Sequence, residues 1–411
     1  MRVLFISKNF PAEPDIQVHG LFGRLRTLVQ GAASSGARLK LLFFVDDLAP
    51  YAGTALESWR QRMQTYFGVE LELAFALVEP YDPSVRGVGG VLRGAFSMFA
   101  QANYARMAGD AQRDAVEKAL AENPDLVFVH RLFCMPPLMR ARRPLPRVFL
   151  DMDDIEHVAF SRSIAQPPVW RSKFLLYLQV PALIRGERQA VRLTEKTFVC
   201  SRLDVEKLKA IGGAGRAAVL PNSVAFPPLA PPAEAPTLLF LGTFLYPPNV
   251  HAMEYMLDKV WPLVRAQIPA ARLVIGGNKP EEIRHFAQPP AGVDFAGFIP
   301  SLDDAYAAAR AVVCPVLSGG GTRVKIVEAA AYARAVVSTT LGMEGLDFTA
   351  DKEILIGDTP EAFAAHCVQL LSDLPRAEQI GLAARRKAQT IYDKAAVVER
   401  IGAWVAGRAA I

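Results

Sequence analysis

Cationic side chains follow three consecutive glycines in the stretch LSGGGTRVKIVE, residues 317–328. This stretch comes after an apolar run, Ala311 to Val316, and leads into a pattern with helical spacing. Glycines let a backbone approach a ligand closely, and the free N–H groups of a helix N-terminus favour an anion. Arg323 and Lys325 stand at the helix end where cations are unfavourable, and a bound phosphate would resolve this conflict. The stretch therefore predicts either a phosphate site or a tight turn followed by a surface Lys325–Glu328 pair.

Neither of two common phosphate-binding fingerprints is present. The chain has no G-x4-G-K-[ST] loop, and its first expected strand is not followed by G-x-G-x-x-G. A nucleoside diphosphate would therefore be held by a different arrangement. We expect Thr322 to N-cap the helix that follows the glycines. The apolar residues of that helix are expected to pack on a sheet.

Two series of alternating strands and helices carry these residues, which is the rhythm of parallel βαβ units. In the first series we expect strands at 2–7, 38–47, 125–130, 147–153, 196–201 and 217–222, and helices at 20–36, 101–122 and 202–211. In the second we expect strands at 238–242, 271–277, 293–298, 311–316, 335–339 and 353–357, and helices at 249–266, 280–286 and 303–309. The six prolines of residues 221–237, between the two series, are typical of a semi-rigid linker.

The sequence therefore predicts an α/β fold with two doubly wound Rossmann-like domains. We place the first domain at 1–222, the linker at 223–237 and the second domain at 238–390. A C-terminal helix at 391–411 is expected to pack back on the first domain. Open parallel sheets bind ligands beyond the carboxyl ends of their strands, so we expect one cleft between the two sheets.

Composition narrows the classes of function. A chain of 411 residues is too long for one ordinary core, and its 51% hydrophobic and 21% charged residues indicate a folded protein. The four cysteines are far apart, without a CxxC pair, which indicates a reducing compartment and no zinc site. A net charge of +5 suits anionic ligands, whereas the scattered basic residues disfavour nucleic acid. No apolar run reaches the roughly 18–20 residues of a membrane span, so we expect a cytoplasmic protein.

The second series resembles the nucleotide-sugar-binding domain of GT-B glycosyltransferases, and specifically of glycosyltransferase family 4. The residues that carry the resemblance are 242–277, 293–316 and 319–346, in the order and spacing of that family. The first series is similar in architecture only. The resemblance implies a GT-B fold, with an acceptor-binding first domain facing a donor-binding second domain across the cleft. It also implies a retaining, metal-independent hexosyltransferase that uses a nucleotide diphosphate sugar as donor, needs no cofactor, and acts on a glycan or lipid-linked acceptor in surface or exopolysaccharide biosynthesis.

The same resemblance implies roles around the glycine turn. Glu328 matches the second glutamate of the family's paired motif, which binds the nucleotide ribose, whereas Gly320 stands where the family has the first glutamate. Arg323 and Lys325 resemble the cations of the branch that reads GGGTRxK, and would stabilise the leaving diphosphate during catalysis. The other donor-binding residues that it implies are Gly242, Thr243, Gly319, Gly321, Thr322 and Glu344. A plain structural turn remains the alternative at Gly242, Thr243 and Glu344.

Acidic residues end one strand of the first domain, in LDMDDIEH at 150–157. We interpret Asp151 as a catalytic residue and Asp153 as an acceptor-side contact. Capping of the next helix, by these residues or by Asp154, is the alternative. An Asp-x-Asp metal site of the kind found in GT-A glycosyltransferases is disfavoured, because those enzymes lack a second α/β half after a proline-rich linker.

Histidines near two other strand ends complete the candidate site. His130 is the best match for the family's first-domain histidine near the donor sugar, and a satisfied histidine at the sheet edge is the alternative. His19 and Gly20, after the first strand, are expected to line the acceptor side, with a plain loop as the alternative.

Other interpretations remain open. A nucleotide-sugar 2-epimerase of similar fold would change the sugar of the donor without any acceptor. A non-catalytic sugar-nucleotide-binding protein would fit the glycine at Gly320. Segments 84–107 and 169–192 mix arginines with aromatic and aliphatic residues. They either contact a bilayer or a lipid-linked acceptor, or pack on the sheet with their arginines exposed. A peripheral contact with the inner face of the membrane is therefore left open, and the sequence does not indicate the oligomeric state.

Overall fold

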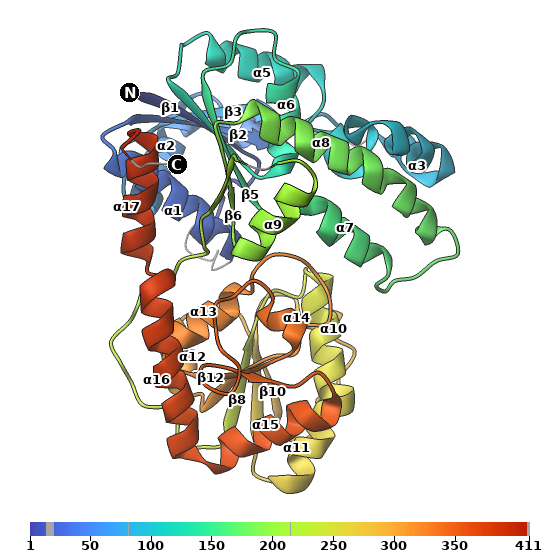
Figure 1. The fold of residues 1–411 in the computed structure, drawn as a ribbon, viewed down its shortest axis with the longest axis vertical. Coiled ribbons are helices and arrows are strands. Elements are labelled where there is room, and N and C mark those ends of the chain that lie inside the picture. Colours follow the sequence, from blue (N-terminus) through green and yellow to red (C-terminus); the bar gives the residue numbers. More distant parts are fainter. Residues whose placement is uncertain (14–19, 81, 214, 409–411) are drawn as a thin grey trace. The chain divides into compact units, whose positions relative to one another are not determined.

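The computed structural model describes residues 1–13, 20–80, 82–213 and 215–408. Their contacts divide the chain into two compact units, each built on its own parallel sheet (Figure 1). Unit 1 comprises Met1–Pro221 and Ala396–Ile411, and unit 2 comprises Asn222–Ala395. The prediction of an α/β fold with two Rossmann-like sheets is confirmed. In the described part of the chain, no helix is long and apolar enough to cross a membrane.

Unit 1 is built on a seven-stranded sheet in which all neighbouring strands are parallel. In spatial order the strands are β3 (Glu72–Leu77), β2 (Arg38–Val45), β1 (Arg2–Ser7), β4 (Leu126–His130), β5 (Arg147–Asp153), β6 (Lys196–Val199) and β7 (Ala217–Val219). The central strands β4 and β6 are buried along their whole length, as expected for strands covered on both faces. The edge strand β3 was not predicted, because its sequence ELAFAL has no β-branched residue and is rich in Ala and Leu, which favour helices.

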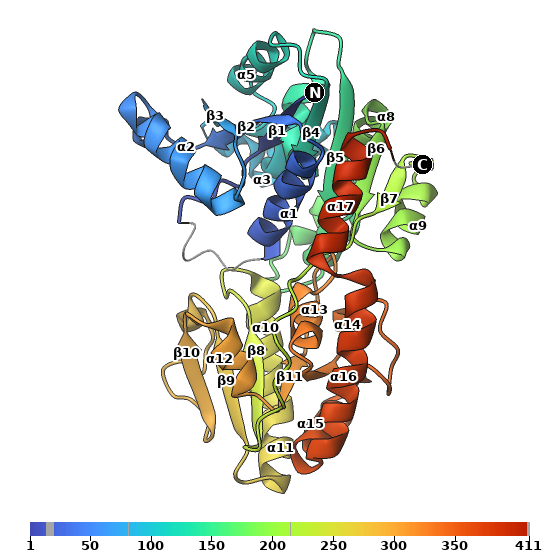
Figure 2. The same ribbon diagram turned by 90° about the vertical axis from the view of Figure 1, so that its left-hand side faces the viewer.

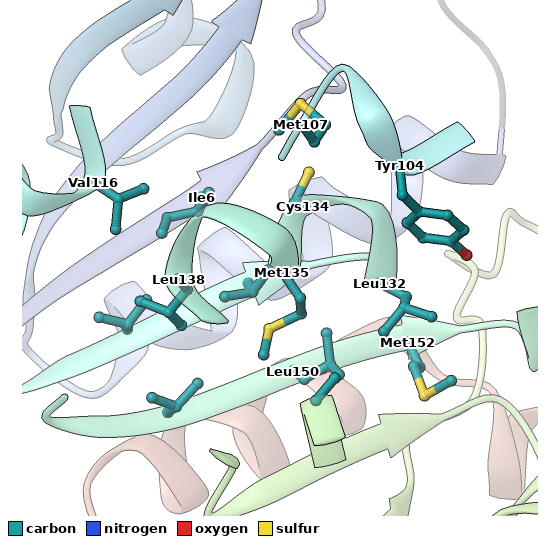
Figure 3. Close-up of a cluster of buried hydrophobic side chains, with 14 of the residues drawn as sticks. Ile6, Tyr104, Met107, Val116, Leu132, Cys134, Met135, Leu138, Leu150 and Met152 are labelled. Atoms are coloured by element: carbon teal, nitrogen blue, oxygen red, sulfur yellow. The ribbon is translucent and has the colours of Figure 1, made fainter. Parts of the chain in front are cut away.

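Helices cover both faces of the unit 1 sheet. They are α1 (Gly20–Ser34), α2 (Thr54–Phe67), α3 (Gly87–Phe96), α4 (Ala102–Ala105), α5 (Asp110–Leu120), α6 (Met135–Met139), α7 (Glu156–Ile164), α8 (Val180–Leu193), α9 (Arg202–Ala210) and α17 (Lys394–Val405). Residues of α5, α6 and α8 form one core with Ile6 and Leu150 of the sheet (Figure 3). The single helix expected at 101–122 is wrong. The chain forms α4 and α5 instead, because Gly109 lies between them and glycine disfavours a helix interior.

The end of the chain completes unit 1. Helix α17 packs beside α1 (Figure 2), so closely that a Cβ at Gly31 would lie 2.5 Å from the Cβ of Ile401. The indole of Trp404 stacks on the ring of Phe198, with 4.8 Å between ring centroids. Residues of α1, α2 and α17 share the second core of unit 1 with the aromatic side chains of β1, β4, β5 and β6.

Unit 2 is built on a six-stranded parallel sheet. In spatial order the strands are β10 (Val293–Gly297), β9 (Arg272–Gly276), β8 (Thr237–Leu241), β11 (Ala311–Cys314), β12 (Ala335–Ser338) and β13 (Leu355–Ile356). The helices are α10 (Pro247–Tyr255), α11 (Trp261–Gln267), α12 (Leu302–Ala307), α13 (Val324–Ala331), α14 (Thr340–Met343), α15 (Pro360–Ser372) and α16 (Leu374–Ile391), with a π-helical turn at Met256–Val260. The helix expected at 280–286 is wrong: only Pro280–Glu282 form a single 3-10 turn.

The proline-rich segment before β8 is attached to unit 2 through its carbonyl groups. Arg334 donates to the carbonyls of Ala230 and Pro231 at 3.0 and 2.9 Å. Arg310 donates to Ala233 at 3.0 Å, and Arg385 reaches a further carbonyl of the same segment. Proline lacks an N–H group but keeps its carbonyl acceptor, so buried arginines can satisfy a segment that has few donors of its own.

Candidate functional site

Two neighbouring strands of unit 2 end beside the predicted donor residues. Strands β8 and β11 are paired in parallel, so their carboxyl ends lie at the same edge of the sheet. Strand β8 leads into Gly242, and β11 leads through the glycine turn into α13, which carries Lys325. The structure brings these two residues together, because a Cβ at Gly242 would lie 3.0 Å from Lys325 Nζ. They are 83 positions apart in the sequence.

The ammonium group of Lys325 is partly buried and is held by uncharged neighbours. It donates to Asn249 Oδ1 over 3.0 Å and lies 3.9 Å from the centre of the Phe240 ring. The Asn249 amide is itself oriented by a 2.8 Å hydrogen bond to the carbonyl of Thr243. Burial lowers the pKa of Lys325 to about 8. No carboxylate among the described residues forms an ion pair with Lys325, and Glu328, one turn away on the same helix, acts on it only through its electric field.

Arg323 closes the glycine turn from within. Its guanidinium donates to the carbonyl oxygen of Gly320 and, over 2.8 Å, to that of Gly321. The buried Nε of Arg323 has no hydrogen-bond partner in the described chain. Gly319 adopts φ = +104°, a conformation that side chains rarely take, and a Cβ there would lie 2.7 Å from Tyr246 Oη. Nη2 of Arg323 also donates to the carbonyl of Ser318 over 3.5 Å, so Arg323 is a support of the turn in this structure.

Glu328 lies one turn beyond Lys325 on α13, and its carboxylate is partly buried. None of the residues that the structure describes forms a hydrogen bond or an ion pair with this carboxylate. The surface ion pair between Lys325 and Glu328, which was the alternative interpretation of this stretch, is therefore not formed. Burial raises the pKa of Glu328 to about 7, although Lys325 lowers it. A partly buried carboxylate without a partner is free to accept hydrogen bonds from a ligand.

The remaining predicted donor residues have mainly structural contacts. Arg323, rather than Thr322, is the N-cap residue of α13, and it makes no side-chain cap, so the predicted Thr322 cap is wrong. The hydroxyl of Thr322 instead accepts a 3.0 Å hydrogen bond from Asn222. The hydroxyl of Thr243 accepts from the N–H of Leu245 over 3.4 Å. Glu344 is partly buried and follows directly on α14.

In unit 1, the predicted catalytic residue Asp151 is fully buried in an ion pair with Arg24 of α1. Nε of Arg24 lies 3.0 and 2.9 Å from the two carboxylate oxygens, and Nη2 lies 2.5 Å from one of them. Arg24 also donates to the carbonyl of Leu220 over 3.0 Å. Burial raises the pKa of Asp151, whereas the guanidinium of Arg24 lowers it. The pair joins α1 to β5, and a catalytic role for Asp151 would require this pair to open.

His130, at the end of β4, is also fully buried. Its Nδ1 lies 3.0 Å from Ser7 Oγ. Its Nε2 lies 3.9 Å from Asp151 and has no hydrogen-bond partner among the described residues. Burial, together with the guanidinium of Arg131, lowers the pKa of His130 to about 3. The imidazole is therefore neutral near pH 7, and its catalytic role stays a prediction.

Asp153 is partly buried between charged and polar neighbours. Arg131 Nη1 lies 3.4 Å from its carboxylate, and the Cys200 thiol donates to it over 3.0 Å. Burial raises the pKa of Asp153 and the nearby guanidiniums lower it, with a net value of about 2. The N-cap residue of the next helix, α7, is Ile155, so no aspartate occupies the capping position.

The other predicted residues of unit 1 add little to a site. Gly20 is the first residue of α1, and His19 lies outside the described residues. Within the ranges that the structure describes, no group of three or more His, Cys, Asp or Glu side chains could hold a metal ion.

Several residues that position Lys325 in unit 2 and Asp151 in unit 1 were not predicted from the sequence. Asn249 and Phe240 hold Lys325, and Arg24 binds Asp151. A signal for Asn249 was its position in the first turn of a helix that starts with two prolines, where a polar residue is close to the preceding strand end. A signal for Arg24 was its place beside Leu25 on the buried side of α1, where a charge requires a partner. No local pattern predicted the position of Phe240.

Part of the chain is similar in sequence to known proteins. Residues 235–373 match the family model described as glycosyl transferases group 1. An uncharacterized 44.6 kDa protein in the cps region of Klebsiella pneumoniae is 26% identical over 172 residues, which are 40% of this chain and 44% of that protein. The chain thus aligns with less than half the length of this curated relative.

Solved structures extend the likeness over nearly the whole chain. Sucrose-phosphate synthase from Thermosynechococcus elongatus has a TM-score of 0.71 at 14% identity, over 98% of both chains. TarM of S. aureus has a TM-score of 0.68 at 9% identity, over 98% of this chain and 99% of TarM, in a complex with Fondaparinux, alpha-GlcNAc-glycerol and UDP. HepE of Anabaena, in complex with UDP and glucose, has a TM-score of 0.63 at 14% identity, over 99% of this chain and 100% of HepE. These similarities show a fold of the GT-B type.

Proposed function

We propose that the protein is a glycosyltransferase that moves a sugar from a nucleotide diphosphate sugar to an acceptor hydroxyl. The observation that carries the proposal is the Lys325 ammonium, which is partly buried beside Gly242 and forms no ion pair with any described residue, so that it lacks a paired counter-charge. A diphosphate would supply that charge. Residues 235–373, which match glycosyl transferases group 1, include Lys325 and the residues that hold it, Asn249 and Phe240.

We assign each donor residue a role that its surroundings permit. Lys325 and the glycine turn bind the diphosphate, and Arg323 keeps the turn in its conformation. The carboxylate of Glu328 accepts hydrogen bonds from the ribose. The backbone of Gly242 and Thr243 lies against the same diphosphate. These roles follow the pattern of family 4, in the branch that reads GGGTRxK, with Gly320 in place of its first glutamate.

The proposed reaction retains the configuration at the anomeric carbon and uses neither a metal ion nor a cofactor. The bond between the anomeric carbon and the diphosphate oxygen breaks, and the acceptor oxygen attacks from the same face through an oxocarbenium-like state. The acceptor proton passes to the departing diphosphate oxygen. Lys325 and Arg323 stabilise the negative charge that develops on that leaving group, which is their contribution to the rate.

We further propose that the acceptor is a glycan of a surface polysaccharide. The alignment with a protein in the cps region of Klebsiella pneumoniae supports this choice. The TarM and HepE structures contain UDP, so uridine diphosphate sugars are the first donors to test. A thermal-shift screen that also includes GDP-, ADP- and dTDP-sugars would identify the donor, because a ligand that binds the native state raises the melting temperature.

A transfer assay tests the proposal. The protein is incubated with the identified nucleotide sugar, with and without a glycan fraction from cells that produce it. We expect release of nucleoside diphosphate that depends on the acceptor, with the sugar recovered on the glycan, an unchanged rate in EDTA, and an anomeric configuration in the product that matches the donor. A changed sugar that is still on its nucleotide would instead identify an epimerase. Donor binding without transfer to any acceptor would identify a binding protein.

The affinity for a nucleotide sugar is expected to be highest between about pH 7 and 8. Below that range Glu328 is protonated, because burial raises its pKa to about 7, and it loses an acceptor for the ribose. Above it Lys325 loses its proton, because burial lowers its pKa to about 8, and the diphosphate loses its counter-charge. The diphosphate of a nucleotide sugar carries no group that titrates near neutral pH. The fall in affinity on the acidic side (the acidic limb) and on the basic side (the basic limb) therefore reflects the titration of protein side chains.

Calorimetric titrations across this pH range measure both limbs. Glu328→Gln is expected to remove the acidic limb, and Lys325→Arg is expected to move the basic limb to higher pH, because a guanidinium stays protonated. A flat profile for the wild type, or limbs that persist in both variants, would contradict the two assignments.

A further inference from the structure

One helical layer of unit 1 turns apolar side chains toward solvent. The layer consists of α3, the 3-10 helix Lys173–Gln179 and the loop that precedes it, and these elements lie beside α7 and α8 (Figure 1). Eight of the twenty large apolar side chains that are exposed in the described chain come from this layer. They are Val88, Leu92, Phe96, Val169, Trp170, Phe174, Tyr177 and Leu178, and we call them the apolar set. Phe96 and Val169 are 82% and 71% exposed.

In this layer the apolar side of a helix faces solvent, whereas an ordinary surface helix buries its apolar side. Val88, Leu92 and Phe96 are four residues apart, so they share one side of α3, and that side is exposed. The side of α3 that packs inward carries Gly94, where a Cβ would lie 2.5 Å from Gln179 Nε2. Polar groups join α3 to the 3-10 helix Lys173–Gln179: the buried Gln101 donates hydrogen bonds to the carbonyls of Gly94 and Gln179, each over 2.9 Å. Surface helices of globular proteins normally bury their apolar side and expose their polar side.

The loop before the 3-10 helix is held in a defined conformation. The buried ammonium of Lys173 donates to the carbonyls of Gln166 and, over 3.1 Å, of Pro168. It also lies 5.1 Å from the centre of the Trp170 ring, whose indole is half exposed. The lysine is therefore used to support the loop, and the exposure of Trp170 and Val169 is part of an organised structure.

The charges within this layer have one sign, and the carboxylate of Asp82, which interacts with Arg93, lies at its border. The chain has no Asp or Glu between Asp82 and Asp110, and none between Glu156 and Glu187. Arginines in those two stretches are exposed on α3, on the neighbouring loops and on α8: Arg86, Arg93, Arg171 and Arg185. The whole chain has 46 basic and 41 acidic residues, so the absence of acidic residues here departs from its general balance.

A hollow lies inside the layer. A cavity of about 490 Å³ has an apolar lining to which Val88, Val91, Phe160, Trp170, Leu175 and Leu176 contribute. Two residues of the apolar set, Val88 and Trp170, therefore stand at the cavity as well as at the surface. Exposed apolar side chains that gather on neighbouring elements usually mark an interaction site.

We propose that this layer docks on the surface of an anionic lipid bilayer. The apolar set enters the boundary between headgroups and acyl chains, the exposed arginines contact lipid phosphates, and the cavity receives an apolar chain end. The charge pattern favours a bilayer over a second copy of this chain, because two copies joined through this layer would bring like charges together. Because the layer belongs to unit 1 and shares no residue with the donor site of unit 2, the proposal does not depend on the transfer reaction.

Vesicle flotation with the full chain tests the proposal. We expect the protein to float with vesicles of phosphatidylcholine and phosphatidylglycerol, to bind phosphatidylcholine alone more weakly, and to be released as salt increases. Arg86→Gln combined with Arg171→Gln is expected to weaken binding to the anionic vesicles on the order of 25-fold, about fivefold for each arginine. Leu92→Ser combined with Phe96→Ser is expected to weaken binding to both kinds of vesicle.

Matched controls separate this surface from the general charge and apolarity of the protein. Arg38→Gln with Arg142→Gln removes the same charge from exposed sites elsewhere in unit 1, and Leu263→Ser with Phe286→Ser removes exposed apolar side chains from unit 2. Both controls are expected to float like the wild type. Wild-type protein that does not float, or controls that weaken binding as much as the variants, would overturn the proposal. So would a wild-type dimer in light scattering that the layer variants dissociate, since it would make a second copy the occupant.

A fluorescence measurement decides the matter if a double variant fails to fold. Vesicles with brominated acyl chains quench an indole that enters the bilayer. We expect quenching of the wild-type protein to be lost in Trp170→Phe, because the other three tryptophans lie in or against the hydrophobic cores: Trp261 is buried in one core of unit 2, and Trp59 and Trp404 pack against one core of unit 1. Equal quenching in wild type and Trp170→Phe would overturn the proposed orientation.

Discussion

Lys325→Met is expected to raise the stability of the ligand-free protein by about 1 kcal/mol and to weaken its binding of nucleoside diphosphates. Burial lowers the pKa of Lys325 from 10.5 to about 8, so the folded state carries a penalty for keeping this ammonium charged. Loss of the Asn249 hydrogen bond offsets part of the gain. Loss of a charge-assisted contact is expected to weaken diphosphate binding by about 2–3 kcal/mol, roughly 30- to 150-fold. Calorimetric unfolding with and without the nucleotide measures both effects.

The pH dependence of this stability difference has a defined sign. Between about pH 8 and 10.5 the unfolded state binds more protons at Lys325 than the folded state does, so the wild type gains stability at this residue as pH rises. The advantage of Lys325→Met is therefore complete at pH 7 and shrinks above pH 8. Lys259→Met, at an exposed position of unit 2, is the matched control and is expected to change neither stability nor binding. A variant that is less stable than the wild type, or that binds diphosphate as tightly as the wild type does, would refute the assignment of Lys325.

Arg24→Met is expected to destabilise unit 1 by about 3–5 kcal/mol, the largest effect that we expect of any substitution in this chain. The change keeps the apolar stem of the side chain but leaves Asp151 fully buried without its cation. It also removes the donor to the carbonyl of Leu220 and one of the cations near Asp153. Hydrogen exchange of β4 and β5, whose amides report the opening of unit 1, measures the loss.

Two variants control this experiment. Arg24→Met combined with Asp151→Asn is expected to recover part of the stability, because the uncompensated charge is gone. Arg60→Met removes an arginine from an exposed i,i+3 pair with Glu57, and it is expected to leave the stability nearly unchanged because water screens the pair. Arg24→Met is also expected to lose less stability at low pH, where the buried carboxylates can be protonated. A loss below about 1 kcal/mol at pH 7 would show that the Arg24–Asp151 pair is not the anchor that its geometry indicates.

The order of strands and helices, and the glycine turn itself, could be read from the sequence because both depend on local chemistry. Apolar runs of strand length alternate with helical spacing in both halves of the chain, and the parallel sheets follow from that alternation. Three glycines before a helical pattern predict a turn of unusual backbone, and Gly319 at φ = +104° has one. Where local signals were weak, the predictions failed: strand β3 was not predicted, and the helix predicted at 280–286 is only a short 3-10 turn.

Contacts between residues on different strands could not be predicted from local sequence patterns. Lys325 meets Gly242 and Asn249 only because β8 and β11 are neighbours, and nothing in the residues around 325 reveals which strand lies beside β11. Asp151 is charged and follows an apolar run, so its sequence suits an exposed strand end as well as a buried ion pair. The partner that decides between them, Arg24, is 127 positions away.

By itself, then, the sequence determined the two α/β units, the turn at 319–321 and the presence of charged side chains beside it. Short-range sterics, helix capping and apolar periodicity are enough for these features, because they act within a few residues. The tertiary structure decided which charges are buried, which are paired, and that α3 turns its apolar side outward. Burial and pairing depend on which segments become neighbours, and that is a property of the whole packed chain.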